Sequence, residues 1–320
     1  MVIPSLMFFM FLYLMSFGMV LGGEDWFLIW LGLEINMMSF LILLYRRYDM
    51  SVIESCMKYF FIQSLGSALL ISILYGGGGV LGSMSSLILG FKIGAGPFYY
   101  WFPSVCSGLN WGSCFMLMLF QKVLPLCLIF MLIHWVIWII ISISLVMGVL
   151  GSFNQSSMSE LMAYSSIHHL GWILIIVMNS SLSWMIYLMV YGFVLLSVVL
   201  LMISNEVVNF NEMFMSESKV WFVVSMLSMA GMPPLLGFFL KWMALINVIS
   251  FGLFYVLALV LVSVIMLYVY LRVVYDCVMG GGVEVSWVLL KDRTQYGLMI
   301  DMSGMLGVVV GLYFVMSLFL

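Results

Sequence analysis

Four charged residues lie inside apolar stretches of the sequence that are long enough to cross a bilayer. They are Glu34, Lys92, Lys122 and Lys241. A charge in the hydrocarbon core of a membrane costs several kcal/mol, so such residues are rare, face a polar interior and often mark a proton or ion path. Burial favours the neutral form of a lysine, whereas a nearby carboxylate favours the charged form, so the two types together can take up and release protons. The pattern predicts a path for protons or other ions.

Five of the six prolines lie close to these lysines. They are Pro97, Pro103, Pro125, Pro233 and Pro234. A proline lacks the N–H that would bond the carbonyl four residues earlier, which is that of Ile93 for Pro97 and of Gln121 for Pro125. Irregular backbone at that depth is tolerated only inside protein or beside water. We therefore predict interrupted helices around the charged side chains.

The charged residues have both functional and structural interpretations. Glu34 and Lys92 form either a fixed ion pair or a pair that separates to gate a proton. Lys122 is the candidate middle relay. We expect Lys241 to occupy the second repeat's equivalent of the Lys92 site; the alternative is that its side chain reaches toward the near membrane interface.

Two adjacent histidines, His168 and His169, lie inside a further apolar stretch with Ser165 and Ser166 nearby. Neighbouring residues of a helix point about 100° apart, so we expect at most one of the two to face the polar interior. A histidine with an ordinary pKa of about 6.5 can relay protons between two lysines. The alternative is a histidine that is hydrogen-bonded in the core and has no relay role.

The composition, 66% hydrophobic and 7% charged, predicts an all-α polytopic membrane protein, since soluble domains contain about 25% charged residues. Stretches of about 17–25 mainly apolar residues predict about eleven transmembrane helices. They cover approximately residues 3–22, 26–45, 56–75, 83–103, 111–133, 135–151, 160–178, 184–203, 220–249, 252–274 and 298–319.

We expect these helices to form one membrane domain over residues 1–320 with an internal repeat. The proline-broken, lysine-bearing helices lie about five helices apart, and a unit with an odd number of helices enters the membrane inverted the second time. The predicted repeats are residues 1–133 and 135–274, with an additional helix at 298–319. Under this count the basic residues in the connections all fall on one side, which places the N-terminus on that side and the C-terminus on the other.

Several classes of site are absent from the sequence. It has no phosphate-binding loop, no dinucleotide-binding glycine motif, no HExxH and no cysteine cluster that could ligate iron and sulfur. We therefore expect no metal and no cofactor in this chain. The net charge of −3 is too small to indicate a nucleic-acid partner.

Six groups of residues resemble the antiporter-like subunits of the mitochondrial proton-pumping NADH:ubiquinone oxidoreductase, respiratory complex I. They are residues 30–36, 58–60 with Gln63, 92–98 with 101–103, 121–122 with Pro125, 163–167 with 169–172, and 231–234 with 237–238 and 241–242. The groups appear in the family's order and span roughly residues 26–245. No motif after about residue 275 matches.

The resemblance implies two inverted five-helix bundles and a polar axis at half-membrane depth. It implies Glu34 and Lys92 as the input pair, Lys122 as the central relay, His169 as the connecting residue and Lys241 as the output lysine. His168 stands where the family has a small residue.

The resemblance also implies the setting of the chain. This is the mitochondrial inner membrane, with the N-terminus and basic loops on the matrix side and the C-terminus on the intermembrane side. The implied partners are other antiporter-like and small membrane subunits and the lipid bilayer. NADH, FMN, iron–sulfur clusters and ubiquinone would be bound elsewhere in the assembled complex. Two other functions fit the same residues: a subunit of a cation/proton antiporter, and a structural scaffold in which the charges are fixed ion pairs.

Overall fold

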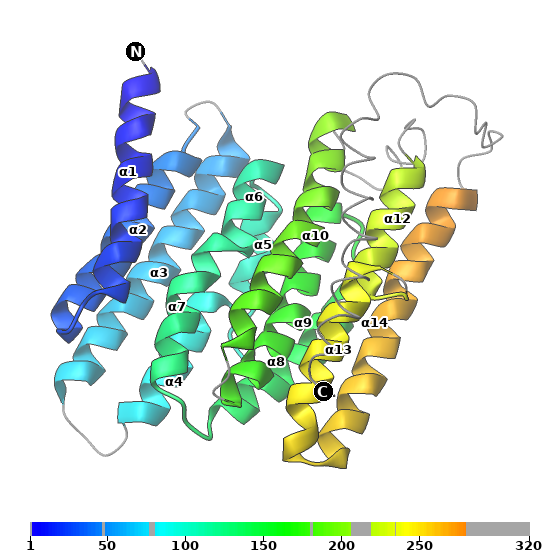
Figure 1. Ribbon diagram of the computed structural model, residues 1–320. Helices are drawn as coiled ribbons and strands as arrows, with labels where there is room; N and C mark the ends of the chain where they lie inside the picture. Colours follow the sequence, from blue (N-terminus) through cyan, green and yellow to red (C-terminus); the bar gives the residue numbers. More distant parts are fainter. Residues whose placement is uncertain are drawn as a thin grey trace. The chain divides into compact units, whose positions relative to one another are not determined.

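The computed structural model describes residues 2–46, 49–76, 81–179, 182–205, 219–233 and 235–279, and its elements in these ranges are helices (Figure 1). The first helices are α1 (Val2–Leu21), α2 (Trp26–Leu44), α3 (Met50–Gly76), α4 (Leu81–Ile93), α5 (Trp101–Cys106), α6 (Trp111–Met118) and α7 (Phe120–Met131). They are followed by α8 (Ile137–Ser152), α9 (Met158–Met178), α10 (Ser183–Asn205), α12 (Lys219–Ala230), α13 (Leu236–Val248), the short 3-10 helix η1 (Ile249–Phe251) and α14 (Leu253–Met279). The helix predicted at 298–319 lies outside the described residues.

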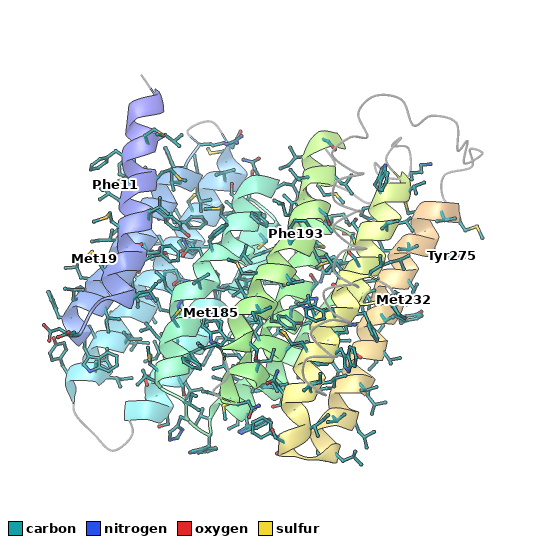
Figure 2. All side chains as sticks on the ribbon, viewed as in Figure 1. Phe11, Met19, Met185, Phe193, Met232 and Tyr275 are labelled. Atoms are coloured by element: carbon teal, nitrogen blue, oxygen red, sulfur yellow. The ribbon has the colours of Figure 1, made fainter. Side chains whose placement is uncertain are left out.

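Six helical segments of the described chain are long and apolar enough to cross a membrane. They are Trp26–Leu44, Met50–Gly76, Trp111–Met131, Met158–Met178, Ser183–Ser204 and Leu253–Met279. Large apolar side chains are exposed on the helices, including Phe11 of α1 and Tyr275 of α14, with exposed fractions of 58% and 60% (Figure 2). Such side chains are suited to contact with lipid. The predicted all-helical, multi-pass membrane fold is confirmed at this level.

The chain divides into two compact units. The first comprises Met1–Leu150 with Ser159–Ser180, and the second comprises Gly151–Met158 with Ser181–Leu320. In the first unit α2 packs on α1 and α3, α3 packs on α4 and α5, and α7 packs on α1, α4 and α6. In the second unit α12 packs on α10, α13 and α14, and α13 also packs on α10. The first unit contains four of the five predicted relay residues.

The predicted helices 83–103 and 220–249 are both interrupted, and these two interruptions have the same backbone geometry. α4 and α12 each end before a glycine, Gly94 or Gly231, with a φ of 77°. The next amide, of Ala95 or Met232, donates to the carbonyl five residues earlier at 2.9 or 3.2 Å. This is the left-handed glycine cap that ends many helices. A glycine is needed because a side chain at that φ is strained.

Helix α9 lies in the core of the first unit. All its residues from Leu161 to Val177 are buried except Tyr164. α8 approaches it closely at Gly148, where an added Cβ would lie 2.7 Å from the backbone nitrogen of His168 and 2.9 Å from its Cα. The backbone of α9 cannot move away from such a contact without repacking. The position of His168 and His169 therefore depends on the absence of a side chain at residue 148.

We expect Gly148→Ala to destabilise the first unit by about 1–3 kcal/mol, because overpacking forces backbone shifts. The measurement is the midpoint of thermal unfolding of the purified protein. Gly18→Ala is the matched control, since an added Cβ at Gly18 of α1 meets nothing within 4 Å. It should be as stable as the wild type or slightly more, because alanine favours a helix over glycine by about 0.5–1 kcal/mol. Equal midpoints for the two variants would contradict the close approach of α8 and α9.

Candidate functional site

Glu34 lies midway along α2 and is bound to the neighbouring helix α3. It is half-buried, and its carboxylate accepts a hydrogen bond from the hydroxyl of Ser67. The indole of Trp30, one turn earlier on α2, donates to the backbone carbonyl of Ser67 at 3.1 Å. The Ser67 hydroxyl also lies 2.9 Å from the carbonyl oxygen of Ser64. α2 therefore holds Ser67 at two points, and the carboxylate has a hydrogen-bond donor.

Lys92 lies in the last turn of α4, against the same face of α3. It is 5% exposed, and its backbone carbonyl accepts a hydrogen bond from Nε2 of Gln63 at 2.8 Å. A Cβ added to Gly66 would lie 2.8 Å from Cγ of Lys92, so the lysine stem crosses α3 where α3 has no side chain. Gln63, Gly66 and Ser67 are spaced three and four residues apart and share one helix face. This face of α3 contacts Lys92 and, through Ser67, Glu34.

Glu34 and Lys92 are not in direct contact. Within the described chain no ion pair joins them. An ion pair is formed instead by Lys58 and Glu54, 2.7 Å apart at an exposed site near the start of α3. Glu34 contacts Ser67 and Lys92 contacts Gly66, which are neighbouring residues of α3. Both side chains therefore lie against one stretch of α3 without forming a direct pair.

Lys122 lies at the start of α7 and joins it to α9. It is 3% exposed, and its amine donates a hydrogen bond to the backbone carbonyl of Ser166 at 3.0 Å. The amine also stands 4.8 Å from the ring centroid of Phe102 on α5, a distance typical of a cation–π contact. Pro125 lies inside α7, as the sequence predicted. The amine is thus held between an aromatic face and a carbonyl that lies close to the two histidines in sequence.

Both histidines are buried in α9, with exposed fractions of 1% for His168 and 2% for His169. Nε2 of His168 accepts a hydrogen bond from the indole of Trp172, one turn later, at 3.1 Å. The centroids of the two histidine rings are 5.8 Å apart, and the rings are nearly perpendicular. His168 is therefore engaged within its own helix, and Ser166, which binds Lys122, lies three residues before His169.

Lys241 lies on α13 in the second unit, and its amine turns back to the helix interruption. It donates a hydrogen bond to the carbonyl of Ala230, the last residue of α12. Gly231 leaves the space for it, because an added Cβ there would lie 3.0 Å from the amine nitrogen. A carbonyl at a helix end has no intrahelical donor, so the ammonium satisfies it.

The expectation that Lys241 takes the place of Lys92 in a second repeat stays a prediction. The interruptions themselves match, but the lysines lie on opposite sides of them. Lys92 precedes Gly94 in the last turn of α4, whereas Lys241 follows Gly231 and lies on α13. The local environments differ accordingly, since Lys92 packs across a neighbouring helix and Lys241 bonds the end of α12.

Two sets of polar residues form hydrogen bonds at or next to these side chains, although the sequence motifs did not predict a role for them. One set, Gln63 and Ser67, holds Glu34 and Lys92 in place. The other joins Tyr13, Tyr59 and Gln121 by hydrogen bonds. A signal was present for the first, because polar residues four apart in an apolar helix share a face. Over the described ranges, no group of three or more His, Cys, Asp or Glu side chains is placed to hold a metal ion.

Comparisons with known proteins agree with this architecture. A family model for the transmembrane part of NADH:quinone oxidoreductases and Mrp antiporters matches residues 23–87 and 79–266. NADH-ubiquinone oxidoreductase chain 2 of Anopheles gambiae is 35% identical over 305 residues, which cover 88% of this chain and 89% of that protein. The chain 2 of Aedes aegypti is 32% identical over 94% of both. The chain belongs to the NADH-ubiquinone oxidoreductase chain 2 family.

Solved structures share the fold of this family member. A chain of respiratory complex I from Thermus thermophilus has a TM-score of 0.74 at 22% identity, covering 89% of this chain and 73% of that one. A chain of the Mrp complex from Dietzia sp. has a TM-score of 0.68 at 18% identity, covering 79% and 56%. The resemblance to antiporter-like complex I subunits that the sequence motifs indicated is confirmed.

We expect Gly66→Ala to displace Lys92 from its position on α3. The new Cβ would meet Cγ of the lysine, near the middle of its stem, so the whole side chain must move. The cost should be about 1 kcal/mol, and a high-resolution structure of the variant should show the amine in a new place. Gly76→Ala, on the same helix with no atom within 4 Å of the added Cβ, should leave Lys92 unmoved. An unshifted Lys92 in Gly66→Ala would refute the contact.

Proposed function

We propose that this chain is a membrane-arm subunit of the proton-pumping NADH:ubiquinone oxidoreductase and that it translocates protons across the mitochondrial inner membrane. Its partners are other antiporter-like and small membrane subunits of that complex. NADH, FMN, iron–sulfur clusters and ubiquinone belong to the assembled complex, and this chain takes part in the enzyme as a subunit without a redox centre of its own. Membership in the chain 2 family supports the assignment.

The observation that supports proton translocation most strongly is the placement of three lysine amines inside the helical units. Lys92 and Lys122 are buried, and the amines of Lys122 and Lys241 are bonded to backbone carbonyls. A backbone carbonyl accepts a hydrogen bond from either a charged or a neutral amine, so each lysine can lose its proton without losing its contact. Charges that move through a medium of low dielectric act strongly on one another, which couples the steps.

We assign the residues in the order that the family resemblance implies. Glu34 and Lys92 form the input, and the charge on Glu34 sets how readily Lys92 holds its proton. Lys122 is the central relay, His169 connects, and Lys241 releases the proton on the output side. Ser166, whose carbonyl holds Lys122, lies one helical turn from His169, which favours the passage from lysine to histidine within the first unit.

The proposal also includes the number of transmembrane helices, their internal repeat and their orientation in the membrane. About eleven transmembrane helices form two inverted five-helix repeats, 1–133 and 135–274, followed by one helix at 298–319. The matching left-handed glycine caps at Gly94 and Gly231 support the repeat. The N-terminus and the basic loops face the matrix, and the C-terminus faces the intermembrane space.

A cation/proton antiporter subunit is the second candidate function. The family model covers Mrp antiporters as well, and a chain of an Mrp complex shares the fold. Purification separates the two: flavin and iron–sulfur proteins in the same large assembly favour the first function. Sodium-dependent proton flux by this chain in vesicles, with no such partners, would favour the second.

The decisive variants are Lys122→Met and Glu34→Gln in the assembled complex. We expect the rate of proton translocation during NADH oxidation to fall roughly tenfold or more, since a missing proton carrier typically slows a proton-transfer step by a factor of this order or larger. The amount of assembled complex should stay close to that of the wild type. The measurement is proton uptake or release by reconstituted vesicles during NADH oxidation.

Lys58→Met is the matched control for these variants. Its side chain is 43% exposed and its ammonium is paired with Glu54 near the start of α3, where an exposed ion pair is worth about 0.2–1 kcal/mol. It should pump like the wild type. Full pumping by both Lys122→Met and Glu34→Gln would instead favour the structural scaffold.

A further inference from the structure

A second hydrogen-bonded cluster includes the residue before Lys122 and joins three helices of the first unit. The hydroxyl of Tyr59 on α3 donates to Oε1 of Gln121 on α7 at 3.2 Å. Nε2 of the same glutamine donates to the hydroxyl of Tyr13 on α1, a longer contact of 3.5 Å. A hydroxyl both donates and accepts, so the glutamine amide can bond both tyrosines in either orientation. Tyr13 and Tyr59 are 2% and 1% exposed.

The backbone around Gln121 is weakly held by its own helix. Pro125 has no N–H for the carbonyl of Gln121. α6 ends at Met118 and α7 starts at Phe120, and Leu119 between them has a φ of −112° and a ψ of −69°, away from regular helix geometry. The first turn of α7 therefore needs contacts from other helices to fix its direction. Gln121 supplies two of them.

The residue after Gln121 is Lys122, whose side chain leaves α7 about 100° away from that of Gln121. Its amine reaches the carbonyl of Ser166 at 3.0 Å and the ring of Phe102 at 4.8 Å. A rotation of the first turn of α7 would carry the amine away from both. The hydrogen bonds of Gln121 therefore fix the rotation of this turn, and with it the direction of the Lys122 side chain.

The two tyrosines are themselves held by their surroundings. The ring of Tyr59 packs edge-on against Phe40 of α2, with centroids 5.4 Å apart, and lies 6.3 Å from Trp101 of α5. The backbone carbonyl of Tyr13 accepts a hydrogen bond from the Ser16 hydroxyl at 2.6 Å, and Asn36 of α2 donates to that hydroxyl at 3.0 Å. These contacts make the tyrosines rigid supports for the glutamine.

We infer that Tyr13, Tyr59 and Gln121 form a hydrogen-bonded clamp that positions the amine of Lys122 against α9. They are positioning residues, because they act through Lys122 and hold no proton of the relay themselves. The inference rests on the proposed function only in its readout, which is the rate of proton translocation through Lys122.

The test uses Tyr59→Phe and Gln121→Leu in the assembled complex. Each change removes hydrogen bonds and keeps most of the side-chain volume. We expect the rate of proton translocation during NADH oxidation to fall roughly two- to tenfold, the ratio of rates that corresponds to the loss of one net hydrogen bond. Tyr13→Phe should have a smaller effect, because its contact is longer. Tyr75→Phe is the matched control: it lies on the same helix as Tyr59, is 66% exposed and should pump like the wild type.

Combining variants distinguishes positioning of Lys122 from a purely structural role. The rate of proton translocation is normalised to the amount of assembled complex in each variant. If the clamp acts through Lys122, Tyr59→Phe should cause no further loss in a Lys122→Met background. A further, independent loss in that background would overturn the inference. The inference would also be overturned if Tyr59→Phe and Gln121→Leu both pump at the wild-type rate while Lys122→Met does not pump. That result would leave the proposed function intact. A wild-type rate of proton translocation by Lys122→Met would instead refute the proposed function.

Discussion

The constraint on which the structure depends is that a charged amine inside an apolar helix bundle must have a hydrogen-bond acceptor. Lys122 finds it in a carbonyl of α9, and Lys241 finds it at the end of α12. The interruption after Ala230 is what creates the second acceptor, because a helix that continued would bond that carbonyl itself. Helix breaks and buried lysines are therefore parts of one solution and not separate features of the chain.

The same constraint explains the role of glycines next to the lysines. A long side chain that turns back toward the protein interior needs space beside a neighbouring backbone. Gly66 leaves that space for the stem of Lys92, and Gly231 leaves it for the end of Lys241. At Gly231 the residue serves two needs at once, because its positive φ also ends α12. The lysines are thus directed by the backbone around them as much as by their hydrogen bonds.

The sequence predicted the helical membrane fold, the charged residues and the helix interruptions, since charge, proline and apolar length are local properties. It could not predict which helix faces meet, because that depends on how helices rotate against each other. The contacts of Ser67 with Glu34 and of Gln121 with two tyrosines belong to this second class. The expected equivalence of Lys92 and Lys241 stays a prediction, although the two lysines lie on opposite sides of their helix breaks in sequence, Lys92 before Gly94 and Lys241 after Gly231.

In the proposed relay, Glu34 and Lys92 change charge, and the absence of a direct contact between them in the described chain suits that role. Breaking a direct buried ion pair by neutralising one partner costs about 3–5 kcal/mol, because the other charge is left uncompensated. Here the carboxylate is bonded to the Ser67 hydroxyl, which also lies within bonding distance of the Ser64 carbonyl. If Glu34 becomes protonated, that hydroxyl keeps its second acceptor. Because Lys92 packs on Gly66 and not on the carboxylate, we expect a change of charge on Glu34 to reach the lysine through the electrostatic field, with the packing of α2, α3 and α4 retained.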